Sequence, residues 1–372
     1  MAELFHGILG LDWRNLAMFA IGALLIWLAV RKNYEPMLLL PIGFGAILAN
    51  IPGSSAVGEH GVLTFLTKYG IENELFPCLI FVAIGAMMDF KPLLQRPFIA
   101  TFGLAAQLGI FFTLFVALAL GFDLKEATAI GIIGAADGPT SIYVANRLAP
   151  RLLGPISVAA YSYMALVPII QPPVIRLLTT RNERRRRMPY TDKPIPRWLL
   201  IVFPVAATLV ASLLAPPAAA LVGMLMFGNL VRECGVLERL AKAAQNELAN
   251  LVTLLLGITI GSTMAGPAFL NWKTLMILGL GLVAFIMDTA GGVLYAKAVN
   301  LFLRHKVNPM VGAAGISAFP MSARVIQRLA QQEDPQNILL AQSVSANVAG
   351  QLGSVFAGST LLAVVLWKLG GA

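Results

Sequence analysis

The sequence predicts an all-α protein that crosses a membrane several times and consists of two repeats of opposite topology. Three observations lead to this prediction. Of the 372 residues, 58% are hydrophobic and only 12% are charged, whereas soluble proteins carry about 25% charged residues. Apolar segments of about 20 residues, long enough to span a bilayer as a helix, recur along almost the whole chain. Short landmarks of the first half also return in the second half in the same order.

The first expected span, about Leu16 to Val30, ends at Arg31 and Lys32, which places its C-terminal end on the cytoplasmic side. Before the next basic run the chain has five apolar segments, near 36–52, 76–90, 97–122, 127–148 and 152–178. Both ends of this stretch are predicted to be cytoplasmic, so the number of crossings must be even. Either one segment is re-entrant, or the region 61–70 also crosses, and the sequence leaves both alternatives open.

The net charge of +9 is concentrated in one connection between apolar spans. The run 181–187 contains five arginines, and Lys193 and Arg197 follow it. A basic loop between membrane spans is typical of a cytoplasmic connection, so we reject nucleic-acid binding as its purpose. The expected organisation is a first membrane repeat over 1–178, a basic cytoplasmic linker over 179–197 and a second membrane repeat over 198–372.

The internal repeat rests on three ordered matches between the halves. The landmarks 43–48, 84–88 and 134–136 correspond to 226–231, 260–264 and 312–314. The first span of the second half, about Trp198 to Leu214, begins just after Arg197 and therefore starts on the cytoplasmic side. The two halves then enter the membrane from opposite faces, which is the inverted-topology repeat found in secondary transporters.

Asp137 lies in the middle of an apolar segment, and it is the most informative residue of the chain. An ionised Asp at the centre of a spanning helix costs about 2.5–3.5 kcal/mol on insertion scales. The following Gly138 and Pro139 break helices, which frees backbone carbonyls that need a partner, water or an ion. The hydroxyls of Thr140 and Ser141 add further oxygens. This combination predicts a cation site; the alternative is a structural Asp paired with an Arg or Lys.

A second interruption is expected at 312–320, where glycines, Ser317 and Pro320 follow the third landmark. In inverted repeats, substrate and ion sites lie near the midplane, where interrupted helices of the two halves face each other. The second break offers the neutral oxygen of Ser317 but no acid. A single carboxylate with neutral oxygens suits a monovalent cation such as Na+ or H+, since divalent sites usually gather more negative charge.

Four further polar residues lie in apolar surroundings. Asp288 is deep in its segment, either as a partner for an Arg such as Arg324 or with a role in proton movement. Asn347 carries a side-chain carbonyl on a helix of small residues, whose close packing does not explain it. Tyr163 is either an interfacial tyrosine or part of a helix that folds back beside the first break. Arg324 would pair with a carboxylate or attract an anionic substrate.

The runs 134–140 and 161–168 resemble the β subunit of the sodium-pumping biotin-dependent decarboxylases, a group that includes the oxaloacetate, methylmalonyl-CoA and glutaconyl-CoA decarboxylases. Further matches to that family are 228–230, 244–246, 308–318 and 347–350. The resemblance implies a division of labour. A soluble carboxyltransferase moves CO2 to biotin on a carrier subunit, and decarboxylation of carboxybiotin at the β subunit drives Na+ outward and consumes a proton.

The resemblance also implies cofactors, partners and site residues. The cofactors are Na+ and carboxybiotin; the partners are a carboxyltransferase α subunit, a biotin carrier and a small membrane subunit. A trimer with elevator-like movement of a core domain, in a bacterial or archaeal cytoplasmic membrane, fits the family. The implied catalytic residues are Asp137, Tyr163 and Arg324. The implied ion-binding residues are Asp137, Asn308, Gly312, Ser317 and Asn347, with Na+ at Asp137, Ser317 and Asn347.

The chain lacks a Met-Lys-Met biotinyl signal and a Gly-rich nucleotide loop, so carboxyl transfer is expected on another subunit. Which residues bind the biotin head group, and which acyl or keto acid the whole enzyme uses, does not follow from the sequence. The main alternative function is a Na+- or H+-coupled secondary antiporter, which shares inverted repeats and broken helices. A non-transporting scaffold is a third alternative, although a scaffold has no need for so costly a group as Asp137.

Overall fold

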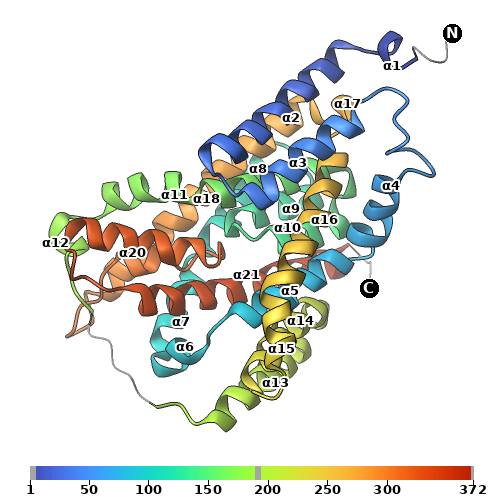
Figure 1. Cartoon of the computed structure of the whole chain (residues 1–372). Helices are drawn as coiled ribbons and strands as arrows, with labels where there is room; N and C mark the ends of the chain where they lie inside the picture. The colour runs from blue at the N-terminus through green and yellow to red at the C-terminus, as the bar shows by residue number, and fades with distance from the viewer. Residues whose placement is uncertain (1–5, 189–193, 370–372) are drawn as a thin grey trace.

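The computed structural model describes residues 6–188 and 194–369, and the regular structure in these ranges is helical throughout (Figure 1). The helices of the first half are α1 (His6–Leu9), α2 (Trp13–Lys32), α3 (Pro36–Ala49), α4 (Val62–Leu66), α5 (Leu75–Met87), α6 (Lys91–Gln95), α7 (Ala100–Ala105), α8 (Leu108–Ala119), α9 (Leu124–Gly131), α10 (Gly138–Leu148), α11 (Leu153–Leu178) and α12 (Arg181–Arg184). Those of the second half are α13 (Arg197–Leu214), α14 (Ala219–Glu233), α15 (Glu238–Ala243), α16 (Ala249–Ser262), α17 (Gly266–Phe269), α18 (Trp272–Val299), α19 (Met310–Ala313), α20 (Met321–Glu333) and α21 (Leu340–Lys368).

Seven helices in the described ranges are long and apolar enough to cross a membrane, which confirms the prediction of a multi-pass membrane protein. The segment Val62–Glu72 forms helix as well, and it is bent by 61° against α5. By length and composition, this pair suits either one broken span or a re-entrant loop. The two alternatives for the region 61–70 therefore both stay open.

The helices form two groups (Figure 1). In the first, which we call the flank bundle, α2 packs on α3, α3 on α16, α5 on α14 and α13 on α14. In the second, the site bundle, α7 to α11 pack with α18 to α21. Helices α2 and α13 bury few of their side chains and expose large apolar ones, such as Trp27 and Leu213. Such surfaces suit contact with lipid tails.

Two glycine pairs allow the helices of the flank bundle to cross at close range. Gly45 of α3 meets Gly261 of α16, and Gly85 of α5 meets Gly228 of α14. A Cβ added at Gly85 would lie 1.8 Å from the carbonyl oxygen of Leu225, and at the other three glycines 2.0 to 2.2 Å from a facing carbonyl oxygen. Because no side chain fits there, glycine is what allows these backbones to touch.

Both predicted helix breaks are present. A short 3-10 turn, η3 (Ile132–Ala135), ends the first half of its span; Ala136 then adopts a left-handed conformation with φ 52° before α10 begins. The second break separates α19 from α20. The two breaks touch, because the backbone N–H of Ser317 donates to the carbonyl oxygen of Ala135 over 3.0 Å. The expectation that the interruptions face each other is met in this contact.

The described part of the basic linker packs on the C-terminal end of α20. Arg184 pairs with Glu333 at 2.8 Å and Arg187 with Asp334 at 2.7 Å. The Arg184 guanidinium holds the pKa of the Glu333 carboxyl below its ordinary value. Lys193, which is predicted to belong to the same linker, lies outside the described residues.

Candidate functional site

Asp137 is the N-cap residue of α10 and is 1% exposed. Among the described residues its carboxylate accepts four hydrogen bonds. Thr140 donates its hydroxyl at 2.7 Å and its backbone N–H at 3.2 Å. From α21, the amide of Gln351 donates at 2.8 Å and the hydroxyl of Ser354 at 2.6 Å. Three of these four donors meet on the same oxygen, Oδ2.

The local sequence explains why a carboxylate ends up at this point. Asp is a favoured N-cap residue, because its side chain accepts the free N–H groups of the first turn. Pro139 in that first turn lacks an N–H and begins a helix without penalty. The positive end of the α10 dipole adds a favourable field. The donors that the described residues offer to Asp137 are all neutral, so the alternative of an Asp paired with an Arg or Lys finds no support in its contacts.

The second break contributes further oxygens beside the same helix. Ser317 donates its hydroxyl to the carbonyl of Gly350 at 2.8 Å. Asn347 donates its amide to the carbonyl of Ile316 at 2.6 Å, and within the described part of the chain its Oδ1 has no partner although it is buried. Asn347, Gln351 and Ser354 share one face of α21 at helical spacing. Helix α21 therefore lies along both breaks.

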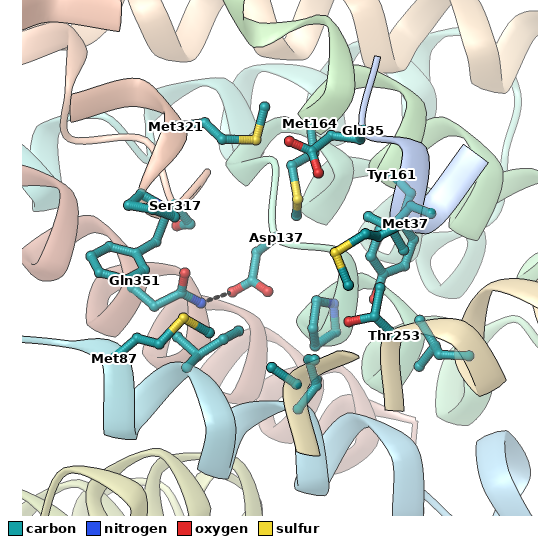
Figure 2. A pocket seen from close by; sticks show the side chains of 18 of the residues that line it. Glu35, Met37, Met87, Asp137, Tyr161, Met164, Thr253, Ser317, Met321 and Gln351 are labelled. Carbon is teal, nitrogen blue, oxygen red and sulfur yellow. Dashed lines mark hydrogen bonds between the residues drawn. The ribbon is translucent and has the colours of Figure 1, made fainter. Parts of the chain in front are cut away.

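Asp137 faces a cavity of about 340 Å³ between the flank bundle and the site bundle. Its lining includes Ser317, Gln351 and Tyr161 from the site bundle, and Thr253 from α16. Figure 2 shows the Asp137 carboxylate at the centre, with Gln351 reaching it. Around it lie four methionines, Met37, Met87, Met164 and Met321. Methionine is flexible and polarisable, so this wall can adapt to different shapes.

Tyr161, rather than Tyr163, lies beside Asp137. The Tyr161 ring covers the first residue of α10, because a Cβ added at Gly138 would lie 2.3 Å from its Cζ. Tyr163 points the other way: its hydroxyl donates to the carbonyl of Leu278 on α18, and its ring packs on Gly281. Residues two apart on a helix differ by about 200° in direction, so only one of the two tyrosines can face the cavity.

Three residues that the sequence singled out lie away from the carboxylate. Asn308 donates to the carbonyls of Arg184 and Arg186 at 2.9 and 2.8 Å, and so fastens the basic linker. Gly312 permits the close crossing of α19 over α18, since a Cβ there would lie 2.0 Å from a backbone oxygen of Gly292. Arg324 is exposed and lines the cavity.

Glu35, in the connection before α3, lines the same cavity as Arg324. Burial raises the pKa of the Glu35 carboxyl, and the nearby Arg324 charge acts in the opposite direction. Glu35, Tyr161, Gln351 and Ser354 are not among the site residues predicted from the sequence. A signal existed for the last two, because polar residues at helical spacing from Asn347 on an apolar helix mark one polar face.

Replacing Ser354 with alanine should weaken cation binding at the predicted site of Asp137 about tenfold. The change removes one hydrogen bond to a charged group, which is worth about 1.5–3 kcal/mol, and 1.4 kcal/mol corresponds to tenfold in affinity. The proton then competes better for the carboxylate. The cation-dependent rise in melting temperature of the purified protein measures the affinity. Ser359→Ala is the matched control, since this buried hydroxyl of α21 has no partner among the described residues; equal effects of the two changes would contradict the prediction.

The chain is similar to known proteins over nearly its whole length. A family model described as Na+-transporting oxaloacetate decarboxylase beta subunit matches residues 14–365. The glutaconyl-CoA decarboxylase subunit beta of Acidaminococcus fermentans is 49% identical, covering 96% of this chain and 95% of that protein. The methylmalonyl-CoA decarboxylase subunit beta of Propionigenium modestum is 46% identical, covering 97% and 98%. The oxaloacetate decarboxylase beta chain of Klebsiella pneumoniae is 42% identical, covering 97% of each chain.

Proposed function

The chain belongs to the family of Na+-transporting oxaloacetate decarboxylase β subunits, and from this premise we propose a function for it. It is the membrane subunit of a Na+-translocating, biotin-dependent decarboxylase. It couples the decarboxylation of carboxybiotin to outward Na+ pumping, while carboxyl transfer takes place on another subunit. The observation that carries the proposal is Asp137, a buried carboxylate at a helix break that faces a cavity between two bundles. The donors that it has among the described residues are all neutral.

The proposed Na+ site consists of Asp137, Ser317 and Asn347. The Oδ1 of Asn347, which has no partner in the described part of the chain, is an amide oxygen that can coordinate Na+. The hydroxyls that now donate to Asp137 can turn their lone pairs toward a cation. Asn308 and Gly312 contribute by holding the segment between α18 and α20 in place, as their contacts with the linker and with α18 indicate.

The cavity is the proposed meeting point of ion and reaction. Arg324 on its wall attracts the carboxylate of carboxybiotin, and the reaction there is N–CO2⁻ + H+ → N–H + CO2. Protonation of Asp137 removes the charge that holds Na+, so proton uptake and Na+ release are coupled through one carboxyl group. Of the two tyrosines, Tyr161 is the one that lies beside this carboxyl group. Tyr163 contacts α18 and is proposed to transfer protons there.

The proposed architecture is a pair of inverted repeats, 1–178 and 198–372, joined by the cytoplasmic linker 179–197. This architecture is supported by the two close glycine contacts of the flank bundle, which are related by the repeat. The landmark around Gly45 corresponds to that around Gly228, and Gly85 corresponds to Gly261; each glycine pair therefore maps onto the other when the halves are exchanged. The adaptable methionine wall between the bundles suits an elevator-like movement of the site bundle against the flank bundle.

The proposed assembly follows the family. A carboxyltransferase α subunit and a biotin carrier supply carboxybiotin from a separate chain, and a small membrane subunit completes the complex. We propose a trimer of this chain in the cytoplasmic membrane of a bacterium or archaeon.

Purification of the complex and its reconstitution into vesicles tests the proposed function. Retention of the chain on avidin resin should reveal the biotin carrier as a partner. Radioactive Na+ should accumulate in the vesicles when one of oxaloacetate, methylmalonyl-CoA or glutaconyl-CoA is added, and avidin should block this uptake. Na+ movement driven by a pH gradient without any of these substrates would instead identify an antiporter, and absence of Na+ movement under both conditions would identify a scaffold.

A further inference from the structure

A second carboxylate, Asp288, is buried in the site bundle and has no part in the function described so far. It is 0% exposed and lies within the 28-residue span α18. Its Oδ1 accepts the backbone N–H of Gly109. Its Oδ2 has no partner among the described residues. The sequence-based alternative of a pair with Arg324 is wrong, because Asp288 accepts the backbone N–H of Gly109 and Arg324 is exposed.

Asp288 lies where α18 meets two interrupted helices. Helix α7 ends at Ala105 and α8 begins at Leu108, so Asp288 caps the start of α8 from a neighbouring helix. Two glycines make room for the carboxylate: a Cβ at Gly109 would lie 2.3 Å from Oδ1, and a Cβ at Gly134 would lie 3.1 Å from Oδ2. Gly134 belongs to the broken span that carries Asp137. The unpartnered oxygen therefore faces the span of the proposed Na+ site.

Capping alone does not account for a carboxylate at this position. An asparagine would supply the same acceptor to the N–H groups of α8 without the cost of burying a charge. Two opposing influences act on Asp288 instead. The dry surroundings and the unpartnered oxygen favour the neutral acid, while the N–H groups and the dipole of α8 favour the ionised form. A carboxyl group under two opposing influences can change its protonation during a cycle.

Few other titratable groups face Asp288. From α11 comes Tyr163, whose ring packs on Gly281, about two helical turns from Asp288 on the same side of α18. Beyond Gly134 lies Asp137. The described parts of α7, α8, η3 and α19 contribute no acidic or basic side chain. The remaining groups on α9 and on α18 itself are Lys125, Glu126, Lys273, Tyr295 and Lys297, of which Glu126 and Lys273 pair with each other at 3.3 Å.

We propose that Asp288 is a second proton-binding site of the pump, a carboxyl group that takes up and returns one proton in each cycle. The proposal rests on the proposed function, in which decarboxylation consumes a proton. The balance is Asp–COOH → Asp–COO⁻ + H+, followed by N–CO2⁻ + H+ → N–H + CO2, with Asp288 reprotonated from the aqueous phase. Tyr163 of α11 donates its hydroxyl to the carbonyl of Leu278, which lies on α18 like Asp288. In this proposal, the proton leaves Asp288 toward Tyr163.

The variants Asp288→Asn and Asp288→Ala separate this role from capping. Asparagine keeps the acceptor for α8, so Asp288→Asn should melt near the wild-type temperature and Asp288→Ala well below it. In vesicles containing the whole complex, Asp288→Asn should lower substrate-driven Na+ uptake about hundredfold, the size expected for the loss of a proton-transfer group, and should flatten its pH dependence. Asp123→Asn is the matched control, because Asp123 caps α9 at an exposed position and should leave rate and pH profile unchanged.

Two outcomes would overturn the proposal. If Asp288→Asn had the rate and pH profile of the wild type, capping would be the only role of Asp288. If Asp288→Asn melted at as low a temperature as Asp288→Ala, the charge would be needed for the structure alone. Infrared spectra of the membrane chain, recorded over a pH series without substrate, give a separate readout. A carboxylic-acid band that titrates in the wild type and in Asp137→Asn should be missing in Asp288→Asn, and absence of such a difference overturns the proposal. Failure of the wild-type complex to take up Na+ would refute the proposed function instead, and the infrared comparison would still decide the role of Asp288.

Discussion

Replacing Asp137 with asparagine should abolish substrate-driven Na+ uptake. The amide has nearly the same shape and keeps an acceptor for the N–H of Thr140, so α10 should still begin at Gly138. What disappears is the negative charge, to which three donors of the site bundle point. Hydrogen bonds to charged groups are worth about 1.5–3 kcal/mol each, and the loss of the charge itself adds to this. We expect Na+ uptake and Na+-dependent decarboxylation to fall at least about hundredfold.

The measurements for Asp137→Asn are radioactive Na+ uptake in vesicles, the Na+ dependence of decarboxylation, and the Na+-dependent rise in melting temperature of the purified chain. Asp12→Asn is a matched control, because Asp12 also caps a helix, α2, but at an exposed position. If Asp137→Asn kept wild-type Na+ uptake and Na+-dependent melting, the carboxylate could not be the Na+ ligand, and the proposed site would have to be given up.

Replacing Gly85 with alanine should destabilise the flank bundle by about 3 kcal/mol or more, at the upper end of what overpacking costs. The added Cβ would lie 1.8 Å from the carbonyl oxygen of Leu225 and 3.1 Å from the backbone N of Asn229. Both atoms belong to the backbone of α14, so no side-chain rotation relieves the clash. The helices must separate, and that movement also disturbs the hydrogen bond from Asn229 to the carbonyl of Met88 at 2.9 Å.

Thermal unfolding of the detergent-solubilised chain measures this effect. The control is Gly223→Ala on α14, where the new Cβ would lie 3.8 Å from the methyl group of Thr208, an ordinary contact. It should leave the melting temperature nearly unchanged, since alanine is also the better helix former. Equal melting temperatures of Gly85→Ala and the wild type would contradict the close contact between the backbones of α5 and α14.

The positions of the spans and of both breaks could be predicted because they depend on local chemistry. A run of apolar residues that crosses a membrane forms a helix, because each backbone N–H and C=O must find its hydrogen-bond partner within the segment. Gly138 and Pro139 then interrupt that helix regardless of its neighbours, and Asp137 is left at the start of the next one. The cost of burying its charge is equally a property of the residue and of the bilayer.

The residues that surround Asp137 depend on how distant segments pack, and for that reason they could not be predicted from the sequence. Gln351 and Ser354 reach Asp137 from more than 200 residues away, through the rotation of α21 about its axis. The same kind of rotation in α11 turns Tyr161 toward the cavity and Tyr163 toward α18. Asp288 accepts the N–H of Gly109 at the start of α8, and the sequence pattern of α18 alone does not predict this contact. By itself the sequence determined a membrane protein with a carboxylate at a helix break; only the tertiary structure decided which side chains surround that carboxylate, because helix rotation and crossing are set by packing between segments.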